Sequence, residues 1–169
     1  LVLSPPTLTD IQKLLLADER PVIVEYCVLP EKLLIFVIEA NKFATKSVTV
    51  SDLELKLLVK EYRENLFEIH NSQRLNKVSR KLYKYLITPI EEDIEHAGIV
   101  VIVPYGWLYY LPFHALIDDK GRYLLQKKEV SYLSSATLWN ILTNKRPSDI
   151  RGSVIDILAF GNPDGSLPA

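Results

Sequence analysis

The side chains capable of nucleophilic chemistry are few and lie far apart in this sequence. The single cysteine is Cys27, and the three histidines are His70, His96 and His114. A cysteine nucleophile needs a nearby histidine to take its proton, and it needs partial exposure, commonly at a strand end or a helix start. Cys27 lies within the apolar stretch VEYCVL, which is typical of the middle of a strand. We therefore expect a buried, inert thiol.

The histidines and one buried acid are interpreted as structural. His114 follows Pro112-Phe113 in an aromatic setting, and we expect it to cap or pack a turn. His70 is expected at the surface near a helix end. His96 is placed in the last turn of a helix, where the dipole favours a cation. Asp156 lies in an apolar strand, where it marks a face turned to a polar partner or a cleft.

Four acidic residues also have a structural interpretation. Thr88-Pro89 is typical of a helix start, and the helix is expected to end near residues 97–98. Acidic side chains in the first turns of such a helix are favoured by its dipole, so we predict neither a metal site nor a general-acid pair. Phosphate-binding glycine loops, zinc-ligand spacings and a G-x-S-x-G elbow are missing from the sequence, so we expect no cofactor and no metal. The four residues are Glu91, Glu92, Asp93 and Glu95.

The N-terminal part predicts a helix and an antiparallel meander. TLTDIQKLLL has a capping-box spacing at Thr9 and Gln12. Three apolar runs follow, VIVEYCVL, LLIFVIEA and FATKSVTV, separated by short turns. Such runs favour three successive antiparallel strands.

Two longer helices should follow the meander. Ser51 and Glu54 have capping-box spacing, and a basic run on the second helix is interpreted as a solvated face. The expected inward stripes are Leu55, Leu58, Tyr62 and Leu66 on the first helix and Leu75, Val78, Leu82 and Leu86 on the second. The basic residues are Arg74, Lys77, Arg80, Lys81 and Lys84.

The C-terminal part predicts an α/β sheet. IVVIV, residues 99–103, is typical of a strand buried on both faces. It runs into an aromatic, hairpin-like segment, and KKEVSYL predicts another strand. Ser134 or Ser135 can cap a helix carrying Leu138, Trp139 and Leu142, and SVIDILAF predicts a further strand. This order implies a right-handed crossover, with the meander extending or flanking the sheet.

Composition limits the class of protein. The 169 residues suit a single domain or subdomain, are 48% hydrophobic and carry a net charge of -1. This charge favours neither nucleic acid nor an anionic membrane as a partner. There is no apolar run long enough to span a bilayer, and one cysteine cannot form an internal disulfide, so we expect a cytoplasmic protein. The absence of methionine suggests a fragment of a longer protein.

The stretch VIVPYGWLYYLPFHAL, with YLLQKKEVSYLSSATL and ILAFGNPDGSLPA, resembles the CHAT family of caspase-like domains, often attached to tetratricopeptide repeats. The family pattern is an apolar strand, a proline, a small turn, Leu-Pro-Phe, a Ser-x-x-Leu segment and a strand ending in Gly-Asn-Pro. The opening strand pair, PVIVEYCVLPEKLLIFVI, is also similar. The matching residues are Pro104, Gly106, Leu108, Leu111, Pro112, Phe113, Leu116, Ser135, Leu138, Gly161, Asn162 and Pro163.

The resemblance implies a mixed sheet with flanking helices and an inactive fragment. In active CHAT peptidases a histidine and a cysteine in the C-terminal half form the dyad. Neither Cys27 nor His114 matches those positions, so no catalytic residue is predicted here. The resemblance implies the N-terminal, noncatalytic half, with the chain's own C-terminal half and upstream helical repeats as partners.

The aromatic stretch predicts an interface. Trp107, Tyr109 and Tyr110 carry large areas and polar handles, and we expect some of this surface to face a missing partner, most simply the chain's own C-terminal half. Two alternatives remain open from the sequence. One is a protein-binding module of a pseudo-enzyme or scaffold, and the other is an independent α/β domain that binds a small ligand at its strand ends.

Overall fold

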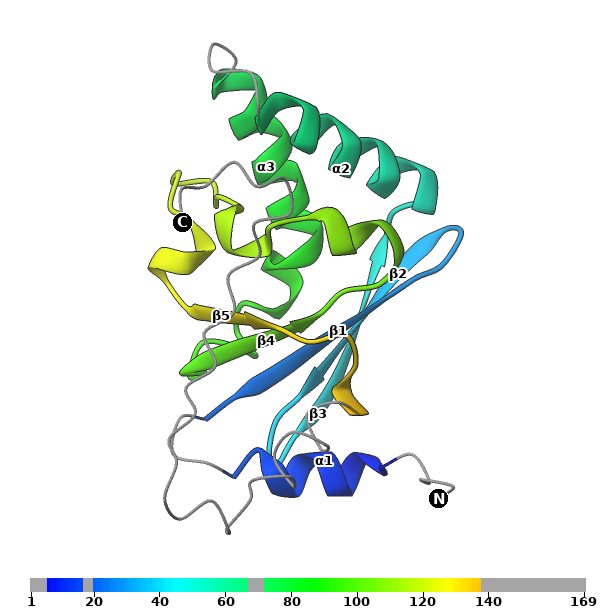
Figure 1. Ribbon diagram of the computed structural model, residues 1–169, viewed down its shortest axis with the longest axis vertical. Coiled ribbons are helices and arrows are strands. Elements are labelled where there is room, and N and C mark those ends of the chain that lie inside the picture. Colours follow the sequence, from blue (N-terminus) through cyan, green and yellow to red (C-terminus); the bar gives the residue numbers. More distant parts are fainter. Residues whose placement is uncertain (1–5, 17–19, 67–71, 138–169) are drawn as a thin grey trace, which may run out of the picture.

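The computed structural model describes residues 6–16, 20–66 and 72–137 (Figure 1). A five-stranded mixed sheet with the order β3-β2-β1-β4-β5 forms its centre. The first three strands are antiparallel neighbours, and β4 lies parallel to both β1 and β5. The expected meander therefore extends an α/β sheet. The strands are β1 Val22–Val28, β2 Lys32–Ile38, β3 Phe43–Thr49, β4 Ile99–Val103 and β5 Glu129–Tyr132.

The inner strands are covered on both faces. Along β4, Val100 and Ile102 pack into a large core, while Val101 and Val103 pack into a smaller one. This alternation follows from the two-residue period of a strand. The prediction of a parallel strand buried on both faces is confirmed.

Helices of unequal length cover the two faces of the sheet (Figure 1). On one face, α2 (Asp52–Leu66) and α3 (Ser72–Leu86) contribute Leu55, Leu82 and other side chains to the large core. On the other face, the short helix α1 (Leu8–Leu14) contributes Ile11 to the small core. The second face is therefore covered over a smaller area. None of the helices within the described ranges has both the length and the apolar character of a membrane span.

The predicted inward stripes are confirmed except at two positions. Leu66 is exposed, and Leu75 is only partly buried. Asn65 takes the buried place at the end of α2, and its side-chain amide donates to the Glu61 carbonyl oxygen at 2.7 Å. The basic residues predicted as a solvated face on α3 are all exposed.

The predicted cap of α1 is wrong, and that of α2 is confirmed only in part. On α1 the cap is Thr7, whose hydroxyl and backbone exchange hydrogen bonds with Asp10, so the box begins two residues earlier than Thr9. Gln12 instead donates to the Glu39 carbonyl oxygen and ties α1 to the turn between β2 and β3. At α2, Ser51 Oγ accepts from the Glu54 backbone N–H, as predicted. The Glu54 carboxylate, however, accepts from Tyr85 and pairs with Lys81 on α3.

Residues 88–97 do not form the expected α-helix. A 3₁₀ helix, Thr88–Ile90, is followed by turns up to residue 96. Pro89 lacks a backbone N–H, and Asp93 is drawn to Lys42 and Lys46 beside the sheet. The helix-dipole explanation of the acidic cluster is therefore wrong, and Glu91 and Asp93 instead pair with lysines from other segments.

The C-terminal predictions fall mainly outside the described residues. A helix begins at Ala136, directly after Ser135. Its predicted apolar positions, the strand SVIDILAF with Asp156, the Gly-Asn-Pro motif and His70 lie outside those ranges. The apolar positions are Leu138, Trp139 and Leu142, and the motif is Gly161, Asn162 and Pro163.

Candidate functional site

The segment that follows β4 forms two 3₁₀ helices, η2 (Gly106–Tyr110) and η3 (Phe113–Ala115), rather than a hairpin. Gly106 begins η2 with φ of +56°, a left-handed conformation that favours glycine. The Leu108 N–H donates to Tyr105, and the Leu111 N–H donates to Leu108. Both bonds span three residues, which is the spacing of a 3₁₀ helix.

The three-residue period of η2 sorts its side chains into two faces. Residues three apart in a 3₁₀ helix lie above one another. Leu108 and Leu111 are both buried, whereas Trp107 and Tyr110 are both exposed. Tyr109 is also exposed, and its hydroxyl donates to the Ser134 carbonyl oxygen. The predicted interface aromatics therefore point in two directions, toward the end of β5 and toward α2.

The buried motif residues form a packing centre. The Phe113 ring is fully buried, with its centroid 5.2 Å from that of Tyr26 on β1 and 6.4 Å from that of Tyr132 on β5. Tyr62 on α2 donates to the Ala115 carbonyl oxygen, and Ser79 on α3 accepts from the Ile117 N–H. Pro104 and Leu116 are buried as well. The motif thus joins the carboxyl end of the sheet to both large helices.

His114 packs a turn, as predicted. Its backbone N–H donates to the Tyr132 hydroxyl oxygen at 3.2 Å, and its Nδ1 lies 2.9 Å from the same oxygen. Burial raises the pKa of Tyr132, so this hydroxyl keeps its proton at neutral pH. The pair therefore fixes η3 against β5.

Cys27 is less buried than expected. It is paired with Leu34 of β2 and shares a strand face with Ile23 and Glu25. Ile23 lies in the small core beneath α1, but Cys27 is only partly buried. The expectation of a buried thiol is wrong, because α1 covers only the beginning of this strand face.

His96 also has a structural partner. Its Nε2 lies 3.0 Å from a Glu39 carboxylate oxygen, so the two described histidines bond to Glu39 and Tyr132. Across residues 6–16, 20–66 and 72–137, no group of three or more His, Cys, Asp and Glu side chains is arranged to hold a metal ion.

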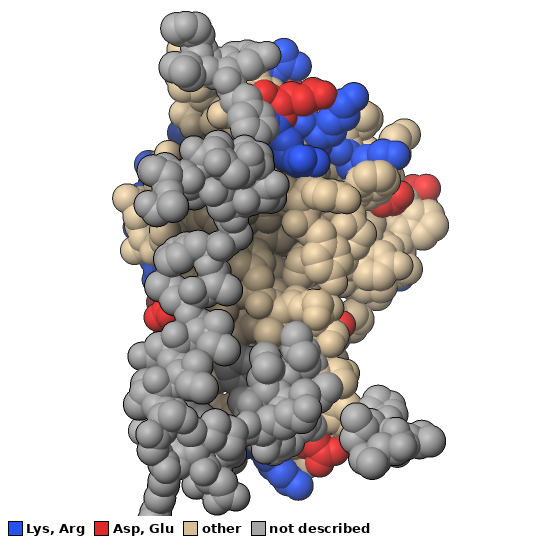
Figure 2. Space-filling model, in the orientation of Figure 1, with Lys and Arg blue, Asp and Glu red and all other residues tan. Residues whose placement is uncertain are grey.

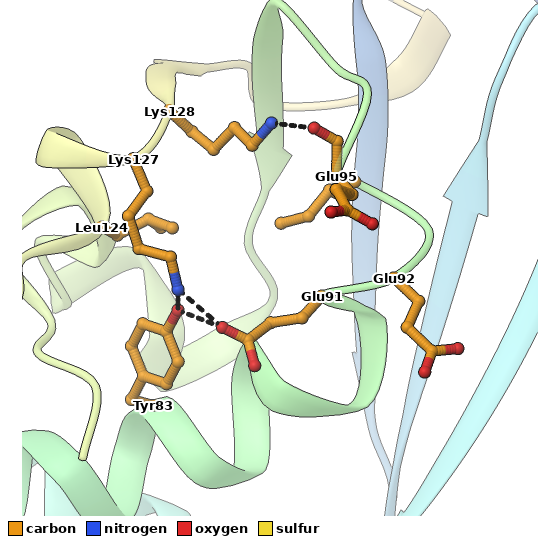
Figure 3. Close-up of a pocket in the computed structure, with 8 residues that line it drawn as sticks. Tyr83, Glu91, Glu92, Glu95, Leu124, Lys127 and Lys128 are labelled. Carbon is orange, nitrogen blue, oxygen red and sulfur yellow. Dashed lines mark hydrogen bonds and ion pairs between the residues drawn. The ribbon is translucent and has the colours of Figure 1, made fainter. Parts of the chain in front are cut away.

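A pocket of about 370 Å³ contains the polar cluster drawn in Figure 3. Lys127 Nζ donates to the Tyr83 hydroxyl at 2.8 Å and to Glu91 Oε1 at 2.7 Å. The Tyr83 hydroxyl in turn donates to Glu91 Oε1 at 2.7 Å. Beside this triad, Lys128 donates to the Glu95 carbonyl oxygen. The cluster ties α3, the 88–97 segment and the start of β5 together.

The three hydrogen-bonded side chains Tyr83, Glu91 and Lys127 shift one another's pKa values. Burial and the Glu91 carboxylate raise the pKa of Tyr83 to about 12. Burial alone would lower the pKa of Lys127, but its bonds to Glu91 and Tyr83 outweigh burial and raise it to about 12. Burial would raise the pKa of Glu91, yet bonds from Lys127 and Tyr83 hold it below the ordinary value. At neutral pH Lys127 is charged, Glu91 is ionised and Tyr83 keeps its proton, so the three side chains hold one another as a structural clamp.

The sequence analysis missed this clamp and the carboxylate next to it. Asp118 is buried, and its Oδ1 accepts from the backbone N–H groups of Lys120 and Arg122, both at 2.9 Å. Its Oδ2 lies 3.6 Å from Lys127 Nζ. The short stretch Asp118-Asp119-Lys120-Gly121 is typical of a turn and was the available signal. The partners of Lys127 lie 36 and 44 residues away, which no local pattern can show.

Comparison with known proteins agrees with the central motif. The family model of the CHAT domain matches residues 76–168, more than half of the chain. No curated protein matches the sequence. Among solved structures, the crystal structure of apo psk41 parM protein aligns with a TM-score of 0.39 and 7% identity, covering 80% of this chain. The chain spans 45% of the length of that protein.

Proposed function

The chain belongs to the CHAT domain family, and from this membership we propose that it is the supporting, noncatalytic half of a caspase-like cysteine peptidase. In this proposal the catalytic half lies C-terminal to the described residues. Its cysteine thiolate attacks the scissile carbonyl after a histidine takes the thiol proton. The half described here continues the sheet beneath that site and holds it in place.

One observation carries the proposal: β5, the last described strand, leaves most of its side chains exposed. β5 is four residues long and parallel to β4, and three of its four side chains are exposed. Within the described residues, the sheet ends at this strand. Parallel strands are normally covered on both faces and extended by further strands, because crossover connections bring helices over them. A further parallel strand and its helix would complete β5; SVIDILAF is the next strand that the sequence predicts in this chain, and the catalytic half would continue the sheet from there.

The described histidines support the absence of cleavage by this half. His96 is held by Glu39 and His114 by Tyr132. A catalytic histidine must instead lie within hydrogen-bond reach of its thiol. We therefore expect the chain to cleave no peptide bond.

The first test measures that expectation. The purified chain is incubated with a panel of fluorogenic peptides and with a peptidyl fluoromethyl ketone that alkylates cysteine-peptidase thiolates. We expect no turnover and no labelling of Cys27. Turnover that is lost in Cys27→Ala would instead place the nucleophile on β1 and overturn the proposal. The variant His114→Ala is measured in the same way and tests whether any turnover depends on this histidine.

The supporting role has a separate test in the native protein. Its sequence past Ala169 should carry a histidine and then a cysteine, each directly after an apolar strand. Hydrogen exchange then compares the native protein with the chain of residues 1–169. We expect the backbone amides of the predicted strand SVIDILAF to exchange more slowly in the native protein, because a neighbouring strand of the catalytic half protects them. Equal exchange in the two proteins would contradict the supporting role.

A further inference from the structure

α2 has a second apolar face, on the side away from the core. Leu53 and Leu57, one turn apart, are 63% and 55% exposed. They lie beside Trp107 and Tyr110, the exposed face of η2, and together these four side chains form the floor of a groove of about 710 Å³. We name it the α2–η2 groove. Exposed apolar side chains gathered in one hollow mark an interaction site more often than scattered ones do.

The rim of the groove is cationic. Lys56, Lys60 and Arg63 line it together with a single acid, Glu64. Three cations and one carboxylate give the rim a net charge of about +2, although the whole chain carries -1. Figure 2 shows Lys and Arg side chains gathered over α2 on the upper part of this face. The groove therefore attracts negative charge while the molecule as a whole does not.

The cations are held over the aromatic floor. Lys56 Nζ lies 4.2 Å from the centroid of the Trp107 ring, and the Arg63 guanidinium lies 4.9 Å from that of Tyr110. These cation–π contacts orient both side chains at the groove wall. The Lys60–Glu64 pair is long at 3.7 Å and solvent-exposed, so it leaves Lys60 free to bind another carboxylate.

The walls of the groove restrict the shape of the occupant. Both walls are helical, α2 and η2, and their backbone groups bond within their own segments. Neither wall presents a strand edge, so an extended peptide could not add to a sheet here. An amphipathic α-helix suits such walls, because it docks through its side chains alone and needs no backbone partner from the groove.

We propose that the α2–η2 groove binds an amphipathic α-helix of a partner protein, with apolar side chains on one face and Glu or Asp side chains flanking them. The apolar face packs on Leu53, Leu57 and Trp107, and the carboxylates pair with Lys56, Lys60 and Arg63. The proposal goes beyond the supporting role, because it uses no residue of β5 and does not depend on a catalytic half.

Two other occupants fit less well. A second copy of the chain, docked symmetrically, would bring the two cationic rims together, and like charges in contact are unfavourable. An anionic lipid surface would suit the charge, but a membrane is contacted by protruding side chains, whereas these apolar side chains lie in a hollow.

The test uses a pair of fluorescein-labelled helical peptides of about 18 residues, or five turns. Both carry leucine at helical spacing, one with flanking glutamates and the other with flanking lysines. Binding to the chain is measured by fluorescence anisotropy. We expect a Kd on the order of 10 µM for the glutamate peptide, weakened roughly tenfold by Leu57→Ser. Leu125→Ser, at an equally exposed leucine outside the groove, should leave the Kd unchanged.

A charge swap tests the rim. In the double variant Lys56→Glu/Arg63→Glu, the glutamate peptide should bind at least about tenfold more weakly and the lysine peptide should bind better. Lys77→Glu with Lys84→Glu makes the same change in net charge on the exposed face of α3 and should alter neither. Circular dichroism verifies that every variant is folded.

Three results would overturn the proposal. The first is that neither peptide binds at concentrations up to about 1 mM. The second is that the charge swap leaves peptide preference unchanged. The third is that Leu57→Ser abolishes either dimerisation, measured by sedimentation, or binding to vesicles of phosphatidylserine and phosphatidylcholine, since the groove would then serve a second copy or a membrane.

Discussion

Phe113 is the residue on which the packing of the motif most depends. Its ring lies between the Tyr26 and Tyr132 rings and has no exposed surface. Replacement by alanine leaves a cavity that rigid strands on two sides cannot close. We expect Phe113→Ala to lower the free energy of unfolding by about 3–5 kcal/mol and Phe113→Leu by about 1–2 kcal/mol. Urea denaturation followed by circular dichroism measures both.

The matched control for Phe113 is Leu125→Ala. Leu125 is 58% exposed on the neighbouring 3₁₀ helix, so its loss should change the free energy of unfolding by less than about 0.5 kcal/mol. Similar costs for the two alanine variants would show that Phe113 does not hold β1, β5 and η3 together.

Lys127 gives a second prediction at the scale of one residue. Lys127→Met keeps the apolar stem but removes the cation from Tyr83 and Glu91. Because Glu91 is partly exposed, solvent screens the pair, and we expect a loss of only about 1 kcal/mol near pH 7. Urea midpoints of the chain and the variant measure this difference.

The same variant predicts a pH dependence. The folded-state pKa of Glu91 is lowered, so its contribution to stability is present above the unfolded value of about 4.3 and is lost as pH falls through the folded value. The deficit of Lys127→Met should therefore be constant from about pH 5 to 8 and shrink below about pH 4. A deficit that persists unchanged at low pH would contradict the ion-pair explanation.

At the scale of elements, the start of η2 depends on one glycine. A Cβ at Gly106 would meet no atom within 4 Å, so the cost of a side chain comes from the backbone conformation alone. With φ of +56°, we expect Gly106→Ala to lose about 1 kcal/mol of unfolding free energy. Gly106→Asn should lose less, because asparagine tolerates the left-handed region.

Thermal or urea unfolding of these two variants supplies the measurement. The pair is its own control, since asparagine is the larger side chain. If Gly106→Asn costs more than Gly106→Ala, steric crowding rather than backbone conformation limits this position.

Elements whose side chains follow a local period could be predicted from the sequence. The sequence of β4 is an unbroken apolar run because both faces of this strand are covered. The inward residues of α2 and α3 recur at helical spacing. The segment after residue 88 could not be predicted in this way. Its proline start is typical of an α-helix, but Asp93 bonds to lysines from a distant part of the chain, and the backbone follows that contact.

At the scale of the whole molecule, the candidate site was only partly visible in the sequence. The aromatic stretch at residues 105–110 stands out by composition, and its exposure could be expected. The α2–η2 groove could not, because the outer leucines of α2 look like ordinary surface positions until η2 is placed beside them. Contacts that join distant segments, such as Lys42 with Asp93 across 51 residues, can outweigh the local preference of a segment for a helix or a strand.

Such contacts also connect the sheet to the 88–97 segment. Asp93 is buried, with Lys42 Nζ 2.7 Å from its Oδ1 and Lys46 Nζ 2.9 Å from its Oδ2. Burial would raise the pKa of Asp93, but the two lysines outweigh it and hold the pKa below the ordinary value. Hydrogen-bonded cations likewise lower the pKa of Glu54 and, against burial, those of Glu91 and Asp118. Each ion pair is therefore lost when its carboxylate is protonated.

We expect the chain to lose stability steeply below about pH 4, because lowered carboxylate pKa values contribute stability that is present above the unfolded values and disappears as pH falls. Asp93→Asn should lower the free energy of unfolding by about 2 kcal/mol near pH 7, since two lysines lose a buried charged acceptor. Asp93→Asn should also make the free energy of unfolding fall less steeply below about pH 4, because one titrating carboxylate has been removed. Urea denaturation from about pH 7 to 3 tests both effects. If the free energy of unfolding falls as steeply with pH in Asp93→Asn as in the unmodified chain, the ion pair does not stabilise the contact between β3 and the 88–97 segment. Apolar packing would then hold the two segments together.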